Sequence, residues 1–274
     1  MAQRMAVRRL SPHAAALGAG ALGAACLTVC PAPAAADGAE QGCPSTFHTR
    51  WNAGWEGGRY STPGTGFHRA EPNIHLVTYV EKLLAGRPPG ARVLVPLCGK
   101  TVDMPFLASR GANVVGVEGA PRAVREFFEE NTSDAPTKCR VGKFEAHYAN
   151  DLAPVQLFLG DFFDLESTTA GMFDAVWDRG SLVAIEPALR ERYVKTIKGC
   201  LSPRAKYLLS VVEHPPFPDG RLGPPYSIAE SEVSRLFAAE FDIEVLPRVQ
   251  VDAEIHASGG ELEEHDYLLT TKGQ

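Results

Sequence analysis

Short apolar runs alternate with helical patterns along most of the chain, and this alternation limits the fold more than any other feature. Successive strands separated by helices pair in parallel, because the chain must cross back over the sheet between them. The pattern predicts an α/β fold with a doubly wound, mostly parallel sheet. The expected strands are residues 92–96, 113–117, 155–159, 173–177, 206–212, 243–246 and 267–270.

Helices between these strands are indicated by residues typical of helix ends. Apolar residues recur at helical spacing over 76–84, and Gly86 follows where a glycine often ends a helix. Pro121 is suited to the first turn of the helix after the second strand. Ser227 and Glu230 have the spacing of a capping box, which predicts a helix beginning there.

The N-terminal segment differs in composition from the rest of the chain. Residues 1–36 contain three arginines and no acidic residue, and residues 14–29 are uncharged and mostly Ala, Gly and Leu. This arrangement is typical of a cleaved targeting peptide. A stable membrane span is not expected, because crossing a bilayer takes about 20 apolar residues. We predict a leader or disordered segment over 1–44 and one domain over 45–274; secretory, organellar and cytosolic locations all stay open.

Composition excludes several kinds of partner. The net charge is −6, and the balance is more acidic still without the arginine-rich start, so a nucleic-acid partner is not expected. The eight histidines and six cysteines form no HExxH or CxxC motif. We therefore expect no metal site and interpret the cysteines outside the leader as buried free thiols.

Ligands of doubly wound sheets bind beyond the carboxyl ends of the strands, where several polar residues are expected here. Glu118 closes the second strand, 19 residues after Gly99, and is placed to accept both hydroxyls of a ribose; a helix-capping role is the alternative. The loop after the first strand lacks the GxGxxG motif that binds a pyrophosphate. A nucleoside without phosphates, such as S-adenosylmethionine, therefore fits better than a dinucleotide.

The third and fourth strands end in charged residues. Asp161 could bind an adenine amino group with Phe162 packed on the ring, or could simply cap a turn. Arg179 places a fixed positive charge where an anionic substrate would lie, and an ion pair with Asp178 is the alternative. An aromatic, glycine-rich stretch that includes Trp51 precedes the sheet. Its aromatic side chains could form a lid over the cofactor or could pack in the core.

These residues resemble the thiopurine S-methyltransferase family, in sequence and in order. The similarity runs over residues 47–272, and the combination of Pro-Leu-Cys-Gly-Lys with Trp-Asp-Arg-Gly is highly specific. The motifs that carry it are Val-Pro-Leu-Cys-Gly-Lys-Thr-Val-Asp-Met at 95–104, Val-Val-Gly-Val-Glu at 114–118, Phe-Asp-Leu at 163–165, Val-Trp-Asp-Arg-Gly-Ser-Leu-Val-Ala-Ile at 176–185 and Gly-Pro-Pro-Tyr at 223–226.

The resemblance implies a seven-stranded methyltransferase sheet with helices on both faces, S-adenosylmethionine as the cofactor, and methyl transfer to the sulfur or selenium of a small thiol or selenol. It implies cofactor contacts at Trp51, Leu97, Gly99, Glu118, Asp161, Phe162 and Arg179, and substrate contacts at Phe67, His68 and Arg179. We expect a monomer. The lid of the family has two aromatic positions, which either Phe47 and Trp51 or Trp51 and Trp55 could occupy. Animal members carry a further substrate-side arginine before the last strand, but residues 251–266 contain none.

Methyl transfer from a sulfonium needs positioning of the nucleophile and exclusion of water more than it needs a general base. Arg179 would act as the catalytic residue by favouring a thiolate through its opposite charge. Two alternatives stay open: a halide or bisulfide methyltransferase, and a protein of this shape that only binds nucleosides.

Overall fold

A computed structural model describes residues 46–60, 68–250 and 262–272, all of which belong to one compact unit within residues 33–274. The leader segment 1–44 and the lid residue Phe67 lie outside the described residues. None of the described helices is long and apolar enough to cross a membrane.

The described part of the chain contains seven α-helices, four short 3-10 helices and nine strands. The helices are α1 (Thr46–Glu56), α2 (Ile74–Leu84), α3 (Asp103–Ser109), α4 (Pro121–Asn131), α5 (Ser167–Ala170), α6 (Arg190–Lys198) and α7 (Glu230–Phe237). The strands are β1 (Arg92–Pro96), β2 (Asn113–Glu118), β3 (Thr137–Val141), β4 (Phe144–Tyr148), β5 (Val155–Leu159), β6 (Phe173–Arg179), β7 (Leu201–Glu213), β8 (Phe241–Val245) and β9 (Glu263–Thr271).

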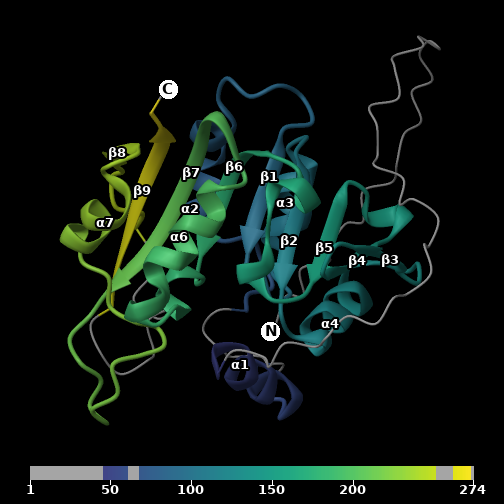
Figure 1. Ribbon diagram of the computed structural model, residues 1–274, viewed down its shortest axis with the longest axis horizontal. Helices are drawn as coiled ribbons and strands as arrows, with labels where there is room; N and C mark the ends of the chain where they lie inside the picture. Colours follow the sequence, from purple (N-terminus) through teal and green to yellow (C-terminus); the bar gives the residue numbers. More distant parts are fainter. Residues whose placement is uncertain (1–45, 61–67, 251–261, 273–274) are drawn as a thin grey trace, which may run out of the picture. The chain divides into compact units, whose positions relative to one another are not determined.

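The strands form one sheet in the order β3-β4-β5-β2-β1-β6-β7-β9-β8 (Figure 1). Neighbouring strands from β5 to β7 are parallel, whereas β9 runs antiparallel to both β7 and β8. The predicted α/β class and the mostly parallel sheet are confirmed. All seven predicted strands are present, and they form the continuous run from β5 to β8.

The strand count of seven was wrong, because a hairpin of β3 and β4 adds two antiparallel strands beside β5. Most residues of β3 are exposed, so the hairpin lacks the continuous apolar run that marks a buried strand. Gly142 has a φ of 58° in the tight turn between Val141 and Phe144. A glycine between two short strand-like stretches was the available signal.

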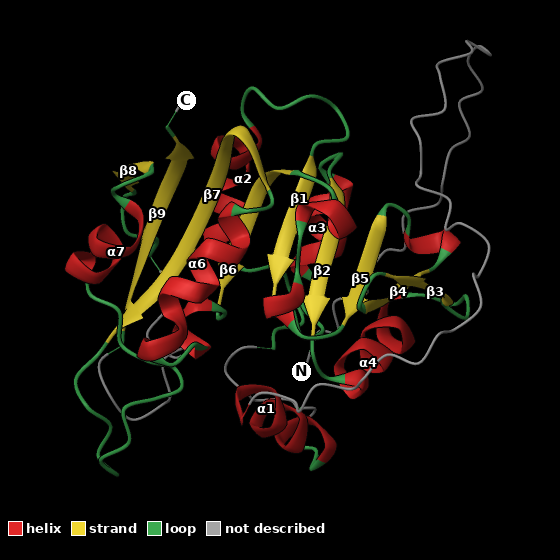
Figure 2. Cartoon of the chain, in the orientation of Figure 1, coloured by secondary structure: helices red, strands yellow, loops and turns green. Residues whose placement is uncertain are grey.

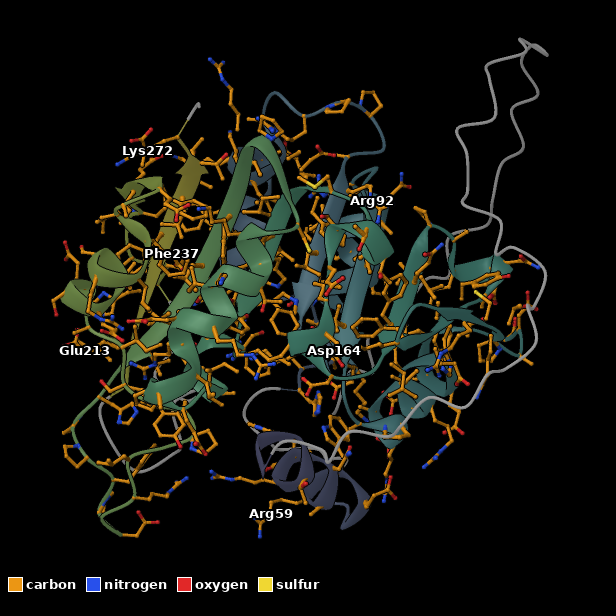
Figure 3. All side chains as sticks on the ribbon, in the orientation of Figure 1. Arg59, Arg92, Asp164, Glu213, Phe237 and Lys272 are labelled. Atoms are coloured by element: carbon orange, nitrogen blue, oxygen red, sulfur yellow. The ribbon has the colours of Figure 1, made fainter. Side chains whose placement is uncertain are left out.

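Helices cover both faces of the sheet, as the doubly wound fold requires. Along β1, Leu94 packs into one core cluster, whereas Val93 and Val95 pack into the other. The first cluster includes residues of α6 and α7, and the second includes residues of α2, α3 and α4. Figure 3 labels Phe237 of α7, whose ring packs edge-on against Tyr207 in the first cluster.

Two local predictions need correction. The helix predicted from Ser227 begins at Glu230 instead, and the Ser227 hydroxyl accepts a hydrogen bond from the backbone N–H of His214 rather than capping it. Cys98 and Cys200 are buried free thiols, as expected, but Cys139 is disulfide-bonded.

The carboxyl ends of the parallel strands β1, β2 and β6 meet at one edge of the sheet, and α1 lies beyond the ends of β1 and β2 (Figure 2). The loop after β1 packs closely over its neighbour strand at Gly116. A Cβ atom there would approach the Sγ of Cys98 to 2.6 Å and the Sδ of Met104 to 2.7 Å. Glycine on β2 therefore lets the loop lie against the sheet.

Candidate functional site

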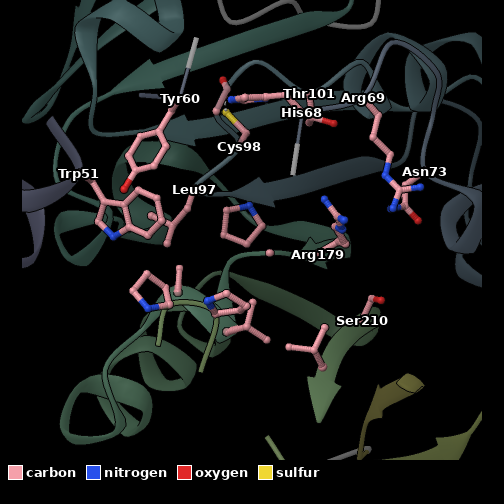
Figure 4. A pocket seen from close by; sticks show the side chains of 18 of the residues that line it. Trp51, Tyr60, His68, Arg69, Asn73, Leu97, Cys98, Thr101, Arg179 and Ser210 are labelled. Carbon is pink, nitrogen blue, oxygen red and sulfur yellow. Dashed lines mark hydrogen bonds between the residues drawn. The ribbon is translucent and has the colours of Figure 1, made fainter. Parts of the chain in front are cut away.

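A cavity of about 620 Å³ opens at this edge of the sheet (Figure 4). Its wall combines the loop after β1, the ends of β2 and β6, residues of α1 and the segment before α2. Of the site residues predicted from the sequence, the cavity is lined by Trp51, His68, Leu97, Gly99, Glu118 and Arg179.

Glu118 is fixed at the wall of this cavity by two backbone hydrogen bonds. Its carboxylate accepts 2.8 Å bonds from the N–H groups of Gly99 and Ala120. The side chain is buried, although it lies at the end of β2. Leu97 and Gly99 have φ angles of 43° and 54°, so the loop after β1 turns sharply beside this carboxylate. The carboxylate is therefore held in one orientation before any ligand arrives.

Aromatic residues of α1 cover the loop after β1. The rings of Trp51 and Trp55 lie 5.1 and 6.0 Å from that of Tyr60, and Trp55 packs 4.9 Å from the His68 ring. A Cβ atom at Gly99 would lie 3.1 Å from His68, so the glycine allows this close approach. Burial, aided by the charges of Lys100 and Arg179 and opposed by Glu126, lowers the pKa of His68 to about 4. His68 is thus neutral near pH 7.

Arg179 ends β6 and lines the opposite side of the cavity. One guanidinium nitrogen lies 3.9 Å from the carboxylate of Glu264 on β9, and Ser210 of β7 is its register partner. Burial lowers the pKa of Arg179, while the charge of Glu264 acts in the other direction. The Arg179 charge is therefore held in a largely desolvated wall, where it acts strongly on a ligand.

The alternative ion pair between Asp178 and Arg179 is not formed within the described residues. The fully buried Asp178 carboxylate instead accepts hydrogen bonds of 2.7 and 2.5 Å from the hydroxyls of Tyr193 and Tyr207, and one of 3.1 Å from the N–H of Leu182. Consecutive strand residues face opposite sides of a sheet, so Asp178 anchors the core while Arg179 faces the cavity.

A buried histidine bridges two acids next to Arg179. His75 of α2 lies 2.5 Å from Glu264 and 2.6 Å from Asp266, both on β9. Burial opposes protonation of His75, but the hydrogen bonds and charges of the two acids outweigh it and raise its pKa to about 9. Burial likewise opposes ionisation of Glu264, but His75, Arg179 and Arg69 together lower its pKa to about 2. At neutral pH this is a charged, hydrogen-bonded cluster beneath the cavity.

Asp161 and Phe162 are not among the described residues that line the cavity. Asp161 accepts a 2.9 Å hydrogen bond from the N–H of Phe163 and caps the short 3-10 helix Phe162–Asp164. The buried Phe162 ring packs 5.0 Å from that of Tyr193. The cofactor roles of both residues stay predictions.

Several cavity residues were missed by sequence reasoning: Tyr60, Arg69, Asn73, Asp103, Ser210, Phe217, Arg221 and Glu264. Asn73 directly precedes the helical pattern of α2, and such a position is typical of an N-cap, which was an available signal. For Ser210 and Glu264 no local pattern distinguishes the residue, since only the pairing of β7 with β9 brings them to the site.

The described residues give no evidence of a cysteine nucleophile or of a metal site. Burial and the nearby Glu118 raise the pKa of the cavity residue Cys98 well above its usual value, so its thiol is a poor nucleophile. The described residues contain no group of three His, Cys, Asp or Glu side chains placed to hold a metal ion.

Proteins of similar sequence are known from vertebrates. A probable thiopurine S-methyltransferase of Danio rerio is 34% identical over 229 residues, which cover 82% of this chain and 95% of the relative. Thiopurine S-methyltransferase of Bos taurus is 36% identical over 211 residues, covering 76% of this chain and 85% of the relative.

Solved structures of similar fold are methyltransferases. Magnesium protoporphyrin IX methyltransferase of Synechocystis, with bound S-adenosylmethionine, superposes with a TM-score of 0.54 at 13% identity, covering 85% of this chain and 100% of that one. An S-adenosylmethionine-dependent methyltransferase of Anabaena variabilis gives 0.55 at 13% identity over 82% and 94% of the two chains. At this identity the likeness establishes the fold.

The family assignment comes from the sequence. The model of the thiopurine S-methyltransferase family matches residues 49–272, a span that begins in α1 and ends after β9. It therefore includes every described residue that lines the cavity. The chain belongs to the thiopurine S-methyltransferase family and is an S-adenosylmethionine-dependent methyltransferase.

Proposed function

We propose that this enzyme transfers the methyl group of S-adenosylmethionine to the sulfur of small thiols, and that it also accepts selenols. The proposal rests on one observation: a single cavity has a negative charge on one wall and a positive charge on another. Glu118 lies at the end of β2 beside the loop after β1, and Arg179 lies at the end of β6. An acid there suits a ribose, and a cation there suits an anionic nucleophile.

The cavity fits a nucleoside-sized cofactor together with a small acceptor. Its volume of about 620 Å³ lies within the range of roughly 300–1,000 Å³ for small-molecule sites. We propose that Glu118 binds the ribose, that the loop at Leu97 and Gly99 contacts the cofactor, and that Trp51 covers it. We propose that Asp161 and Phe162 contact the adenine side of the cofactor with main-chain atoms, in place of the side-chain contacts expected from the sequence, because the Asp161 carboxylate accepts from Phe163 and the Phe162 ring packs against Tyr193.

When bound, the cofactor supplies a methyl group on a cationic sulfonium. The chain contributes orientation, charge and exclusion of water. Arg179 holds the acceptor as a thiolate, since a cation near a thiol lowers the pKa of that thiol. We propose that Phe67 and His68 border the acceptor. His68 is neutral at physiological pH and so adds no second positive charge there.

We further propose that residues 45–274 form the catalytic unit, that residues 1–44 are a leader, and that the enzyme acts as a monomer without nucleic acid. Every described cavity residue lies between Arg50 and Glu264, inside the proposed unit. The net charge of −6 disfavours a polyanionic partner.

A labelled-methyl assay tests the proposal. Purified protein is incubated with methyl-labelled S-adenosylmethionine and, separately, thiophenol, selenite with a reducing thiol, iodide and bisulfide. Labelled thioanisole supports the proposal. Turnover confined to iodide or bisulfide would assign the enzyme to halide or bisulfide methylation instead. Binding of S-adenosylhomocysteine without turnover of any acceptor would leave only a nucleoside-binding role.

A further inference from the structure

Asn73 places a buried hydrogen-bond donor at the cavity wall. The residue is only 2% exposed. Its Oδ1 accepts a 2.9 Å bond from the N–H of His75 and caps α2, and its own backbone N–H donates a 2.7 Å bond to Asp103. The Nδ2 amide group is buried and has no hydrogen-bond partner within the described part of the chain. Buried donors are almost always paired, so this one needs an acceptor that the described residues do not supply, and its place at the cavity wall lets a bound molecule supply it.

Arg69 lies in the same corner of the cavity. Arg69, Asn73 and Arg179 all line the cavity, and Figure 4 draws the three side chains on the same side of it. Burial is the main cause that lowers the pKa of Arg179, and the positive charge of Arg69 lowers it further. The two cations are therefore close enough to repel one another. Arg69 makes no hydrogen bond or ion pair with any residue that the structure describes.

The acids nearest this corner are engaged by other donors. Glu264 bonds to His75 at 2.5 Å, and the two oxygens of Asp103 accept from the Asn73 N–H and, at 2.8 Å, from the indole of Trp177. They offset part of the positive charge without supplying an acceptor to Arg69 or to the Asn73 amide. The corner therefore presents donors to the cavity while its overall charge stays moderate.

We infer that Arg69, Asn73 and Arg179 form a binding site for a carboxylate. Two guanidinium groups and an amide donor suit the two oxygens of a planar monoanion. A phosphate dianion fits less well, because Glu264 and Asp103 would repel its second charge. The inference rests on the proposed function, in which two carboxylates can reach the corner: that of the amino-acid end of the cofactor, and one carried by the methyl acceptor.

The first experiment tests the cofactor as the source and needs no turnover. Calorimetry compares S-adenosylhomocysteine with 5′-methylthioadenosine, which lacks the carboxylate, on wild type, Arg69→Gln and Asn73→Ser. Serine keeps the cap of α2 while removing the amide donor. If the cofactor carboxylate binds here, both variants lose about 10- to 100-fold in affinity for S-adenosylhomocysteine and keep that for 5′-methylthioadenosine. Arg125→Gln, on the exposed face of α4, controls for net charge.

The second experiment tests the acceptor as the source. At saturating cofactor, KM is measured for 4-mercaptobenzoate and for thiophenol with the same variants. If the acceptor carboxylate binds here, KM for 4-mercaptobenzoate rises about 10- to 100-fold and that for thiophenol is unchanged.

The site is rejected if folded Arg69→Gln and Asn73→Ser proteins, with wild-type unfolding temperatures, keep S-adenosylhomocysteine affinity and 4-mercaptobenzoate KM within about twofold of wild type. The proposed function fails by a different result, namely that wild type methylates neither thiol. The calorimetric comparison stands in that case, so the two failures are distinguishable.

Discussion

Glu118 accepts a 2.8 Å hydrogen bond from the backbone N–H of Gly99, 19 residues earlier in the chain. This bond joins the end of β2 to the loop after β1, the two segments from which a cofactor would be held. The second oxygen of the same carboxylate accepts from Ala120, at the start of α4. One side chain therefore fixes the loop, the helix start and the proposed ribose contact together.

Replacing Glu118 with alanine should weaken S-adenosylhomocysteine binding by about 1–3 kcal/mol, or roughly tenfold to a hundredfold. Both a charge-assisted hydrogen bond and the fixed loop at Gly99 are lost. Calorimetry gives the affinity, and thermal unfolding of the same sample reports any general loss of stability. Glu129→Ala, on the exposed side of α4, is the control. Unchanged affinity in Glu118→Ala would reject the ribose role.

Replacing Arg179 should change the pH dependence of methyl transfer. Its positive charge favours the bound thiolate, so the rate of wild type should rise with pH until the bound thiol is ionised. Arg179→Ala removes this charge and should move the rise to higher pH by about one unit or more. Rate profiles with thiophenol under saturating cofactor provide the measurement. An identical profile for the variant and wild type would count against a thiolate held by Arg179.

The hydrogen bonds of Asp178 predict a large effect on stability. Asp178→Ala leaves the hydroxyls of Tyr193 and Tyr207 and the N–H of Leu182 buried without their acceptor. We expect a loss of about 3–5 kcal/mol in the free energy of unfolding, against about 1–2 kcal/mol for Tyr207→Phe, which removes one donor. Urea unfolding measures both. Equal losses for the two variants would contradict this account of the network.

His75 predicts a fall in stability at alkaline pH. Its pKa is raised from 6.5 to about 9 in the folded protein, so its stabilising effect is complete below pH 6.5 and is lost as the pH rises through 9. The shift corresponds to on the order of 3 kcal/mol. Urea unfolding at pH 6 and pH 9.5 should show a smaller difference for His75→Gln than for wild type. Equal differences would show that His75 does not stay protonated.

The lowered pKa of Glu264 predicts that the same ion pair also stops stabilising the fold at acid pH. This stabilisation is present above pH 4.5 and is lost as the pH falls through about 2. The His75–Glu264 interaction is a single one, so the two shifts are not added.

Removal of the N-terminal segment should leave the enzyme active. A shortened protein that begins at Gly42 retains all described cavity residues and should match the full chain in kcat/KM for thiophenol and in unfolding temperature. The physical reason is that residues 14–29 are small and apolar, as in a leader removed after targeting. Lost activity in the shortened protein would place this segment within the enzyme.

Much of the fold could be predicted from the sequence, because buried parallel strands are continuous apolar runs. The runs at β1, β2 and β5 and the proline at the start of α4 have local signatures that tertiary contacts do not override. The β3–β4 hairpin escaped prediction because an exposed edge strand lacks such a run. Ser227 failed as a cap because its hydroxyl bonds to His214 instead, a choice that depends on how the chain folds back.

By itself, the sequence determined the order of the strands along the chain, and hence that Glu118 and Arg179 end strands of one sheet. The tertiary structure alone decided which charges meet at the cavity. The antiparallel pairing of β9 with β7 brings Glu264 to within 3.9 Å of Arg179, which precedes it by 85 residues. Only the packing of α2 against that strand buries His75 between two acids. Such contacts between distant segments depend on strand register and helix packing, which leave no pattern around the individual residues.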